Sequence, residues 1–493
     1  MSLTTACLLT LLRTIVLCLF AWPIAVSIER WMRSLADRWR SLAFAVLLAP
    51  FLFPELLVGY TFRDAALSSP QRAEWLCAGL LFVRIVPVGV VTLLASPAAL
   101  VSAAAIHCRT IVWQANRQSL GAWWHLLACY WYGPFQRAWP ALGLMSVIAF
   151  QEFELAALLQ AASWTDWFIA AQRMALDRQQ MARQAVWPIL MQLPLLVAAI
   201  RWLTHQNPTQ SDPHEEISVP TPSYVHGLVP LYLALALTVG CLIPLCGMGW
   251  SLNSGLKLLA SHPMQWTGLG REALIAGAAS LCAGWTAWFV SRRLLEISRT
   301  NYPALGVCWI VLIPGLAGSL LLSLAIVALF QQTWLRPLYD TPLPWVLALS
   351  VWLLPRAILL RLWIRKLTRT EAVHLAQIAL GSIESNPSTG TSFKAATSIS
   401  RSRFRTAGLL FRLRDQPQWL AIGLLCYWAY VDLSSAYLLA PSGMSSGLVR
   451  LYDFMHYGRS APLSAESLLF FGLPLLVMFL VLRIGRIILS RGH

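Results

Sequence analysis

Long apolar runs recur along the whole chain, and shorter polar or basic segments separate them. A helix needs about 20 mainly apolar residues to cross the hydrocarbon core of a bilayer. The pattern therefore predicts an all-α, polytopic membrane protein with about 11 (10–12) transmembrane helices. The predicted spans are 5–27, 41–62, 75–101, 138–161, 184–204, 226–248, 271–291, 303–330, 343–364, 418–439 and 466–489.

The order of these runs predicts two pseudo-symmetric halves, 1–205 and 226–493, joined by a polar linker at 206–225. Each half reads as a helix, a basic turn, a Pro-containing helix, another helix, a long basic segment and two more helices. The second half adds a joining helix at 226–248 and a basic segment at 365–416. A duplicated bundle with a pathway between its halves is a common plan for transporters.

The charges fit a membrane protein better than a nucleic-acid-binding one. Only 12% of the residues are charged, 58% are hydrophobic, and the net charge of +16 comes almost entirely from Arg. Arg gathers at helix ends that face an anionic cytoplasmic leaflet, so we expect no nucleic-acid partner. With the N-terminus outside, most Lys and Arg fall on the inner side. We therefore predict a multi-pass protein of the plasma membrane (the bacterial inner membrane) with a cytoplasmic C-terminus.

Two motifs of common enzyme chemistry are absent from the sequence. It contains no GxxxxGK[ST] phosphate loop and no HExxH, so we predict that the chain is not an enzyme and hydrolyses no ATP itself. Its ten Cys form no CxxC pair, and no cluster has metal-ligand spacing, so we expect no bound metal or cofactor. A membrane transferase remains an alternative, although its outer loops would offer only scattered carboxylates such as Asp64 and Asp340.

The segment 429–470 resembles the same region of ferric-iron-type permeases of binding-protein-dependent ABC importers. In that family a turn of the Arg-Glu-Leu-Ser-Ala type precedes a leucine-rich Ala-Pro, and an outer loop follows with Val-Arg-Ile-Tyr and His-Tyr-Gly. The matching residues here are Val431-Asp432-Leu433-Ser434, Leu438-Leu439-Ala440-Pro441, Val449-Arg450-Leu451-Tyr452 and His456-Tyr457-Gly458.

A second resemblance lies at 117–160, which is similar to the cytoplasmic coupling loop of such permeases. The family pattern is Glu-Ala-Ala-x-x-x-Gly, and the resemblance implies that the loop docks into an ATPase subunit. The matching positions are Ala115, Leu120, Gly121 and Ala122 in the first half, and Ala376, Leu380 and Gly381 in the second. The motif glutamate is missing in both halves, and about thirty residues rich in Ser, Thr and Arg (383–414) follow the second turn.

The resemblance implies a permease subunit that moves a small solute, ferric iron first among the expected cargoes. Two copies of a cytoplasmic ATPase would drive it, so that ATP acts only through these partners, and an extracytoplasmic binding protein would deliver the solute. Because both motif glutamates are missing, a degenerate membrane scaffold without ATPase coupling remains an alternative.

Charged residues inside the apolar runs are the remaining candidates for function, because each costs at least about 2.5 kcal/mol in the bilayer core. Glu152 and Asp432 occupy similar places in the two halves. We expect them either to line a pathway or brace a gate, or to pair with Arg84 or Arg356 for packing. The pathway or gate candidates are Glu152, Asp432, Ser434, Arg84 and Arg356. The outer-loop motif is Arg450, Tyr452, His456, Tyr457 and Gly458, which we expect to form a turn that contacts the binding protein rather than a metal site.

Overall fold

The protein is described from a computed structural model. The described residues are 2–95, 100–101, 124, 138–173, 183–194, 217–218, 223, 225–261, 263–297, 313–367, 378, 415–444 and 446–491. Within them the chain is α-helical, which confirms the predicted class, apart from one short antiparallel pair. In that pair, β1 (Leu100–Val101) bonds to β2 (Ile217–Ser218), with Leu100 opposite Ser218.

The chain divides into two compact units. The first comprises Met1–Gly247 with Leu316–Leu321, and the second comprises Met248–Gly315 with Leu322–His493. The predicted joining helix at 226–248 therefore belongs almost wholly to the first unit, and the division lies about 20 residues beyond the expected linker.

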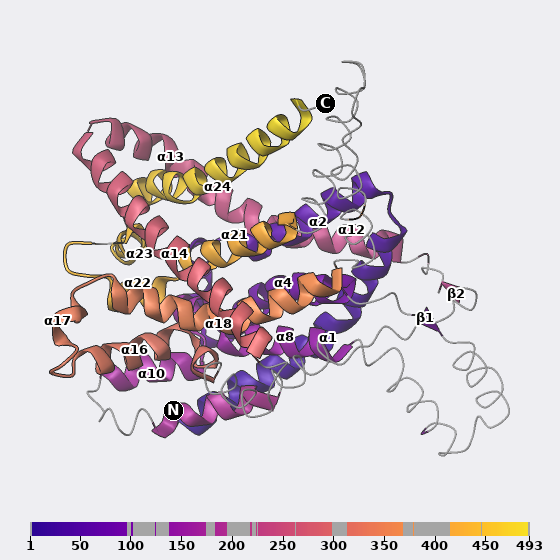
Figure 1. The fold of residues 1–493 in the computed structure, drawn as a ribbon, viewed down its shortest axis with the longest axis horizontal. Coiled ribbons are helices and arrows are strands. Elements are labelled where there is room, and N and C mark those ends of the chain that lie inside the picture. The colour runs from indigo at the N-terminus through magenta and orange to yellow at the C-terminus, as the bar shows by residue number, and fades with distance from the viewer. Residues whose placement is uncertain are drawn as a thin grey trace, which may run out of the picture. The chain divides into compact units, whose positions relative to one another are not determined.

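The described residues of the first unit form α-helices and a π-helical turn, and Figure 1 labels α1, α2, α4, α8, α10 and α12 among them. They are α1 (Leu3–Ser34), α2 (Asp37–Leu52), α3 (Glu55–Leu67), α4 (Pro70–Ala95), α8 (Ala138–Gln151), α9 (Glu154–Leu159), α10 (Trp164–Arg173), α12 (Val225–Leu237) and the π-turn η3 (Thr238–Leu242), which leads into α13 (Ile243–Ser261). Residues 183–194 are also helical.

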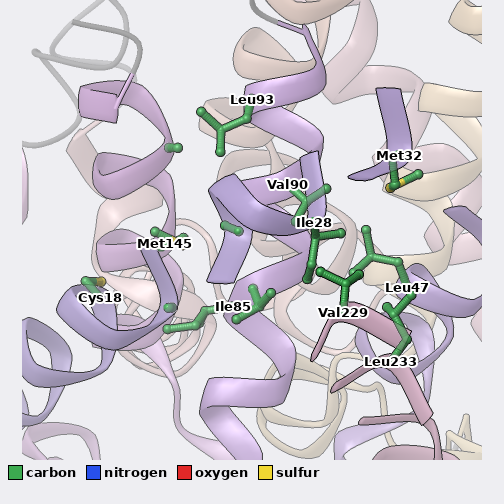
Figure 2. Close-up of a cluster of buried hydrophobic side chains, with 14 of the residues drawn as sticks. Cys18, Ile28, Met32, Leu47, Ile85, Val90, Leu93, Met145, Val229 and Leu233 are labelled. Carbon is green, nitrogen blue, oxygen red and sulfur yellow. The ribbon is translucent and has the colours of Figure 1, made fainter. Parts of the chain in front are cut away.

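The core of the first unit lies between α1, α4 and α8, with α2 and α12 packed beside them. Figure 2 shows Ile28 of α1, Val90 of α4 and Val229 of α12 pointing toward one another. Small residues let these helices approach closely, as is usual where helices pack without water. A Cβ on Gly89 would lie 2.6 Å from the sulfur of Met145.

Two helices of the first unit are interrupted. Pro54 has no backbone N–H and separates α2 from α3, which bend by 66° at this break. Residues Glu152 and Phe153 separate α8 from α9. The short helices α3 and α9 then pack together, and a Cβ on Gly59 would come within 2.5 Å of Leu158.

The second unit contains the remaining helices, and α14, α18 and α21 pack together at its centre (Figure 1). Its helices are most of α13 (from Met248 on), α14 (Pro263–Ile297), α16 (Gly318–Phe330, of which the first residues group with the first unit), α17 (Arg336–Tyr339), α18 (Leu343–Leu367), α21 (Gln416–Tyr430), α22 (Leu433–Leu439), α23 (Gly447–His456) and α24 (Ser460–Arg491). The chain bends by 54° between α21 and α22.

In the described part of the chain, five helices are long and apolar enough to cross a membrane, or seven if each of the two bent pairs counts as one span. Two of the other predicted spans contain shorter apolar helices, Ala141–Gln151 and Gly318–Phe330. The predicted total of about 11 therefore remains a prediction.

In both units, apolar side chains are exposed and several charged side chains are buried, a distribution that suits a bilayer better than water. The outward faces carry Leu19 of α1, Leu231 of α12 and Leu274 of α14, each at least 66% exposed. The charged side chains of Arg84, Arg361 and Glu466 are buried instead. Apolar side chains outside and charged groups turned inward are expected of helices that are solvated by lipid.

Candidate functional site

The break between α2 and α3 leaves backbone carbonyl groups without partners in the helix. Arg84 of α4 donates hydrogen bonds to two of them. Its guanidinium donates to the carbonyl oxygen of Phe53 at 3.0 Å and to that of Phe51 at 3.2 Å. It also pairs with the carboxylate of Glu55, the first residue of α3. In lipid each unsatisfied carbonyl group would cost several kcal/mol, so Arg84 stabilises a break that the apolar surroundings would otherwise oppose.

Glu152 lies at the second break and belongs to the same cluster. Its Oε1 accepts a hydrogen bond of 3.0 Å from the backbone N–H of Leu155, in the first turn of α9. Its carboxyl group is also close enough to Glu55 and to Arg84 to interact with both electrostatically. A guanidinium and two carboxyl groups therefore lie near the two breaks.

Asp432 occupies the break between α21 and α22 in the second unit. It is the N-cap of α22, and its Oδ2 accepts a hydrogen bond of 2.9 Å from the backbone N–H of Ser435. The hydroxyl of Ser435 in turn contacts that of Ser323 on α16 at 3.1 Å. Ser434 is also buried, and its hydroxyl makes no hydrogen bond with the residues that the structure describes.

Arg356 lies on α18, one residue after Pro355, and is held by aromatic rings. Its guanidinium carbon lies 3.8 Å from the ring centre of Trp352 and 5.6 Å from that of Trp428. Cations attract the faces of such rings, and the attraction is larger away from water. The structure thus places Arg84 with Glu152 in one cluster, while Arg356 stacks on two tryptophans.

The outer-loop motif forms α23 and the turn after it. Arg450 of α23 bonds to Glu466 of α24 at 2.7 Å and lies 3.6 Å from Glu272 of α14, so it ties three helices together. Tyr452 stacks on His456 with ring centres 6.4 Å apart, and Tyr457 is exposed. Gly458 ends the helix with φ of +67°, a conformation that glycine adopts without strain.

Among the described residues, no group of three or more His, Cys, Asp and Glu side chains could hold a metal ion. The arrangement holds charged groups in apolar surroundings beside three helix breaks.

The predicted coupling positions Ala115, Leu120, Gly121, Ala122, Ala376, Leu380 and Gly381 lie outside the described residues.

Sequence reasoning missed three carboxylates that the fold brings to these arginines: Glu55, Glu272 and Glu466. Glu55 had a usable signal, because it follows Pro54 inside the apolar run 41–62. A carboxylate at the start of a helix after a proline is favoured by the helix dipole. Glu272 and Glu466 stand at the ends of predicted spans, where carboxylates are ordinary.

Comparison with protein-family models, with curated proteins and with solved structures finds no match to this chain.

Proposed function

We propose that this chain is the transmembrane permease of a binding-protein-dependent importer of the ABC type and moves a small solute across the plasma membrane. The observation that carries the proposal is the pair of buried acidic residues, Glu152 and Asp432. Each lies at a break in an apolar helix and accepts a hydrogen bond from the backbone of the piece that follows. Broken helices with buried charges are typical of solute pathways, because irregular backbone is tolerated in a membrane only where it faces protein or water.

The order of elements supports a duplicated plan. In the first unit α1, α4 and α8 pack together, and α8 breaks at Glu152 before α9. In the second unit α14, α18 and α21 pack together, and α21 ends just before Asp432 and α22. The third helix of each trio breaks at an acidic residue, and an arginine stands on the second helix of each, Arg84 on α4 and Arg356 on α18. We infer that the two units are copies of one design and that a pathway runs along the acidic breaks.

Partners and cargo follow from the sequence resemblance. Two ATPase subunits would engage the turns at Gly121 and Gly381, and a binding protein would engage the outer face near Tyr457. Ferric iron is the proposed cargo, carried as a substrate that the binding protein delivers.

Co-purification tests this proposal. The tagged full chain is crosslinked in its native membrane and then extracted in mild detergent. It should bring down a protein with a GxxxxGK[ST] loop, identified by mass spectrometry. Leu120→Asp in the predicted coupling turn should reduce that recovery. Tyr457→Asp, a matched change in the predicted outer loop, should not.

The same experiment decides between the permease and the scaffold without ATPase coupling. If a well-folded chain brings down no ATPase and supports no solute uptake, the permease proposal fails. Equal recovery of the ATPase with Leu120→Asp and with wild type would reject the proposed coupling turn.

A further inference from the structure

A pocket of about 200 Å³ lies in the second unit, where α14, α18 and the start of α21 come together. Its lining combines aromatic rings with two guanidinium groups. The lining residues are Trp285, Trp288, Phe289, Arg292, Arg361, Asp415, Gln418, Trp419 and Ile422. The transport proposal uses none of them.

Arg361 of α18 is held rigidly at this pocket. It donates to the hydroxyl of Ser291 at 2.9 Å and to the carbonyl oxygen of Trp288 at 2.6 Å, and its guanidinium carbon lies 3.8 Å from the Trp288 ring centre. The residue is 9% exposed. No carboxylate of the described residues lies within ion-pair distance of it. A guanidinium fixed by neutral partners keeps its full charge for a ligand at low cost in side-chain entropy.

Positive charge is in excess around Arg361. Arg292 and Arg365 act on it as like charges. Glu296 is engaged by Arg292 at 2.8 Å and by Arg293 at 3.5 Å, so one carboxylate serves two arginines. Asp415, the N-cap residue of α21, also lines the pocket. Its carboxylate makes no cap hydrogen bond with the backbone of that helix. The first amide groups of α21 add a partial positive charge.

An apolar stripe leads away from the charged end of the pocket along α14. Leu281, Trp285 and Phe289 are four residues apart and therefore share one face of the helix. Leu281 and Phe289 are exposed, and so are Trp419 and Leu420 of α21. Tryptophan beside arginine at a helix end is typical of the bilayer interface, and this is the end predicted to face the anionic cytoplasmic leaflet.

We propose that this pocket binds the phosphate headgroup of an anionic phospholipid, whose acyl chains lie along Leu281, Phe289 and Leu420. Arg361 and Arg292 contact the phosphate, and the aromatic rings contact the glycerol region and upper chains. A free phosphate would use the same guanidinium groups but would leave the apolar stripe without a partner. The inference depends on placement in a bilayer and not on transport, so it survives failure of the importer proposal.

Lipid titration of the delipidated full chain in neutral detergent tests the proposal, with native mass spectrometry counting the bound molecules. Phosphatidylglycerol should bind in preference to phosphatidylcholine with the same chains. Arg292→Gln should weaken phosphatidylglycerol binding by about fivefold, the effect of one basic residue near an anionic surface. Arg293→Gln is the matched control, because Arg293 shares Glu296 with Arg292 but is 80% exposed and does not line the pocket.

Arg361→Gln should weaken binding further, and Arg292→Gln keeps the test valid if that variant does not fold. Equal binding of the two lipids would overturn the proposal, and so would equal weakening by Arg292→Gln and Arg293→Gln. Displacement of the lipid by inorganic phosphate at an equal concentration would assign the site to a free anion and reject the lipid.

Discussion

The guanidinium of Arg84 donates a hydrogen bond of 3.0 Å to the carbonyl oxygen of Phe53, the residue immediately before the Pro54 break. The same side chain pairs with Glu55 immediately after that break. A single arginine from α4 therefore satisfies both sides of an interruption that would otherwise leave polar backbone in an apolar medium. Loss of the Arg84 side chain should therefore destabilise the packing around the Pro54 break.

Replacing Arg84 by Leu should destabilise the first unit by about 3–5 kcal/mol, because Glu55 and the carbonyl groups before Pro54 would lose a buried cationic partner. Thermal unfolding in detergent, followed by the loss of monodisperse protein on gel filtration, measures the effect. Arg72→Leu removes an exposed arginine from the same helix and should change stability by less than about 0.5 kcal/mol. Equal melting of the two variants would contradict the role assigned to Arg84.

Asp432→Asn and Asp432→Ala should separate the capping role of this residue from its charge. Asn keeps an oxygen that can accept from the Ser435 N–H, whereas Ala loses the cap, at a cost of about 1 kcal/mol. We therefore expect wild-type protein levels but reduced solute uptake for Asp432→Asn, and reductions in both for Asp432→Ala. Full uptake by Asp432→Asn would show that the charge has no part in the pathway.

Glu152→Gln should be tolerated far better than Glu152→Leu. The Oε1 of Glu152 accepts a hydrogen bond of 3.0 Å from the Leu155 N–H in the first turn of α9. The Gln amide oxygen can still accept from this N–H, whereas Leu leaves a buried donor unsatisfied, at about 1–3 kcal/mol. Protein level and melting temperature in detergent report the difference, and equal loss in both variants would argue against the role of this hydrogen bond.

Gly447→Ala should disrupt the packing of α23 on α24. The added Cβ would lie 2.3 Å from a ring carbon of Phe470, and overpacking of this kind costs about 1–3 kcal/mol. Gly423→Ala in α21 is the control, because nothing lies within 4 Å of its added Cβ. Adding Phe470→Leu to Gly447→Ala should restore part of the lost melting temperature. A variant that melts like the wild type would show that α23 can move away freely.

Acid should loosen the connection between Asp340 and Ser442. The Ser442 hydroxyl and backbone N–H donate to the Asp340 carboxylate at 2.6 and 2.8 Å, and these hydrogen bonds lower the pKa of Asp340 below its ordinary value. Because the folded pKa is depressed, the stabilisation is complete above the ordinary value of about 3.9 and is lost as the pH falls through the lower folded value. The protection factor of the Ser442 amide against hydrogen exchange should fall over that acid range in the wild type. Asp340→Asn should remove the pH dependence.

The sequence by itself determined the helical class and the location of most apolar helices, because run length and apolar content are local properties of the chain. It also singled out Arg84, Glu152 and Asp432, since a charge inside an apolar run is conspicuous without any knowledge of the fold. The sequence did not determine the break after α2, because α4 and α18 continue through Pro87 and Pro355 whereas α3 begins only after Pro54.

Only the tertiary structure decided which residues meet. It brought Glu55 to Arg84, joined Arg450 to Glu466 and Glu272, and grouped α12 with the first unit. Apolar helices resemble one another in composition, so hydrophobic pattern alone does not choose their neighbours. The choice depends on shape at particular points, such as Gly59 against Leu158 and Gly89 against Met145, where the absence of a side chain lets two segments far apart in the sequence approach.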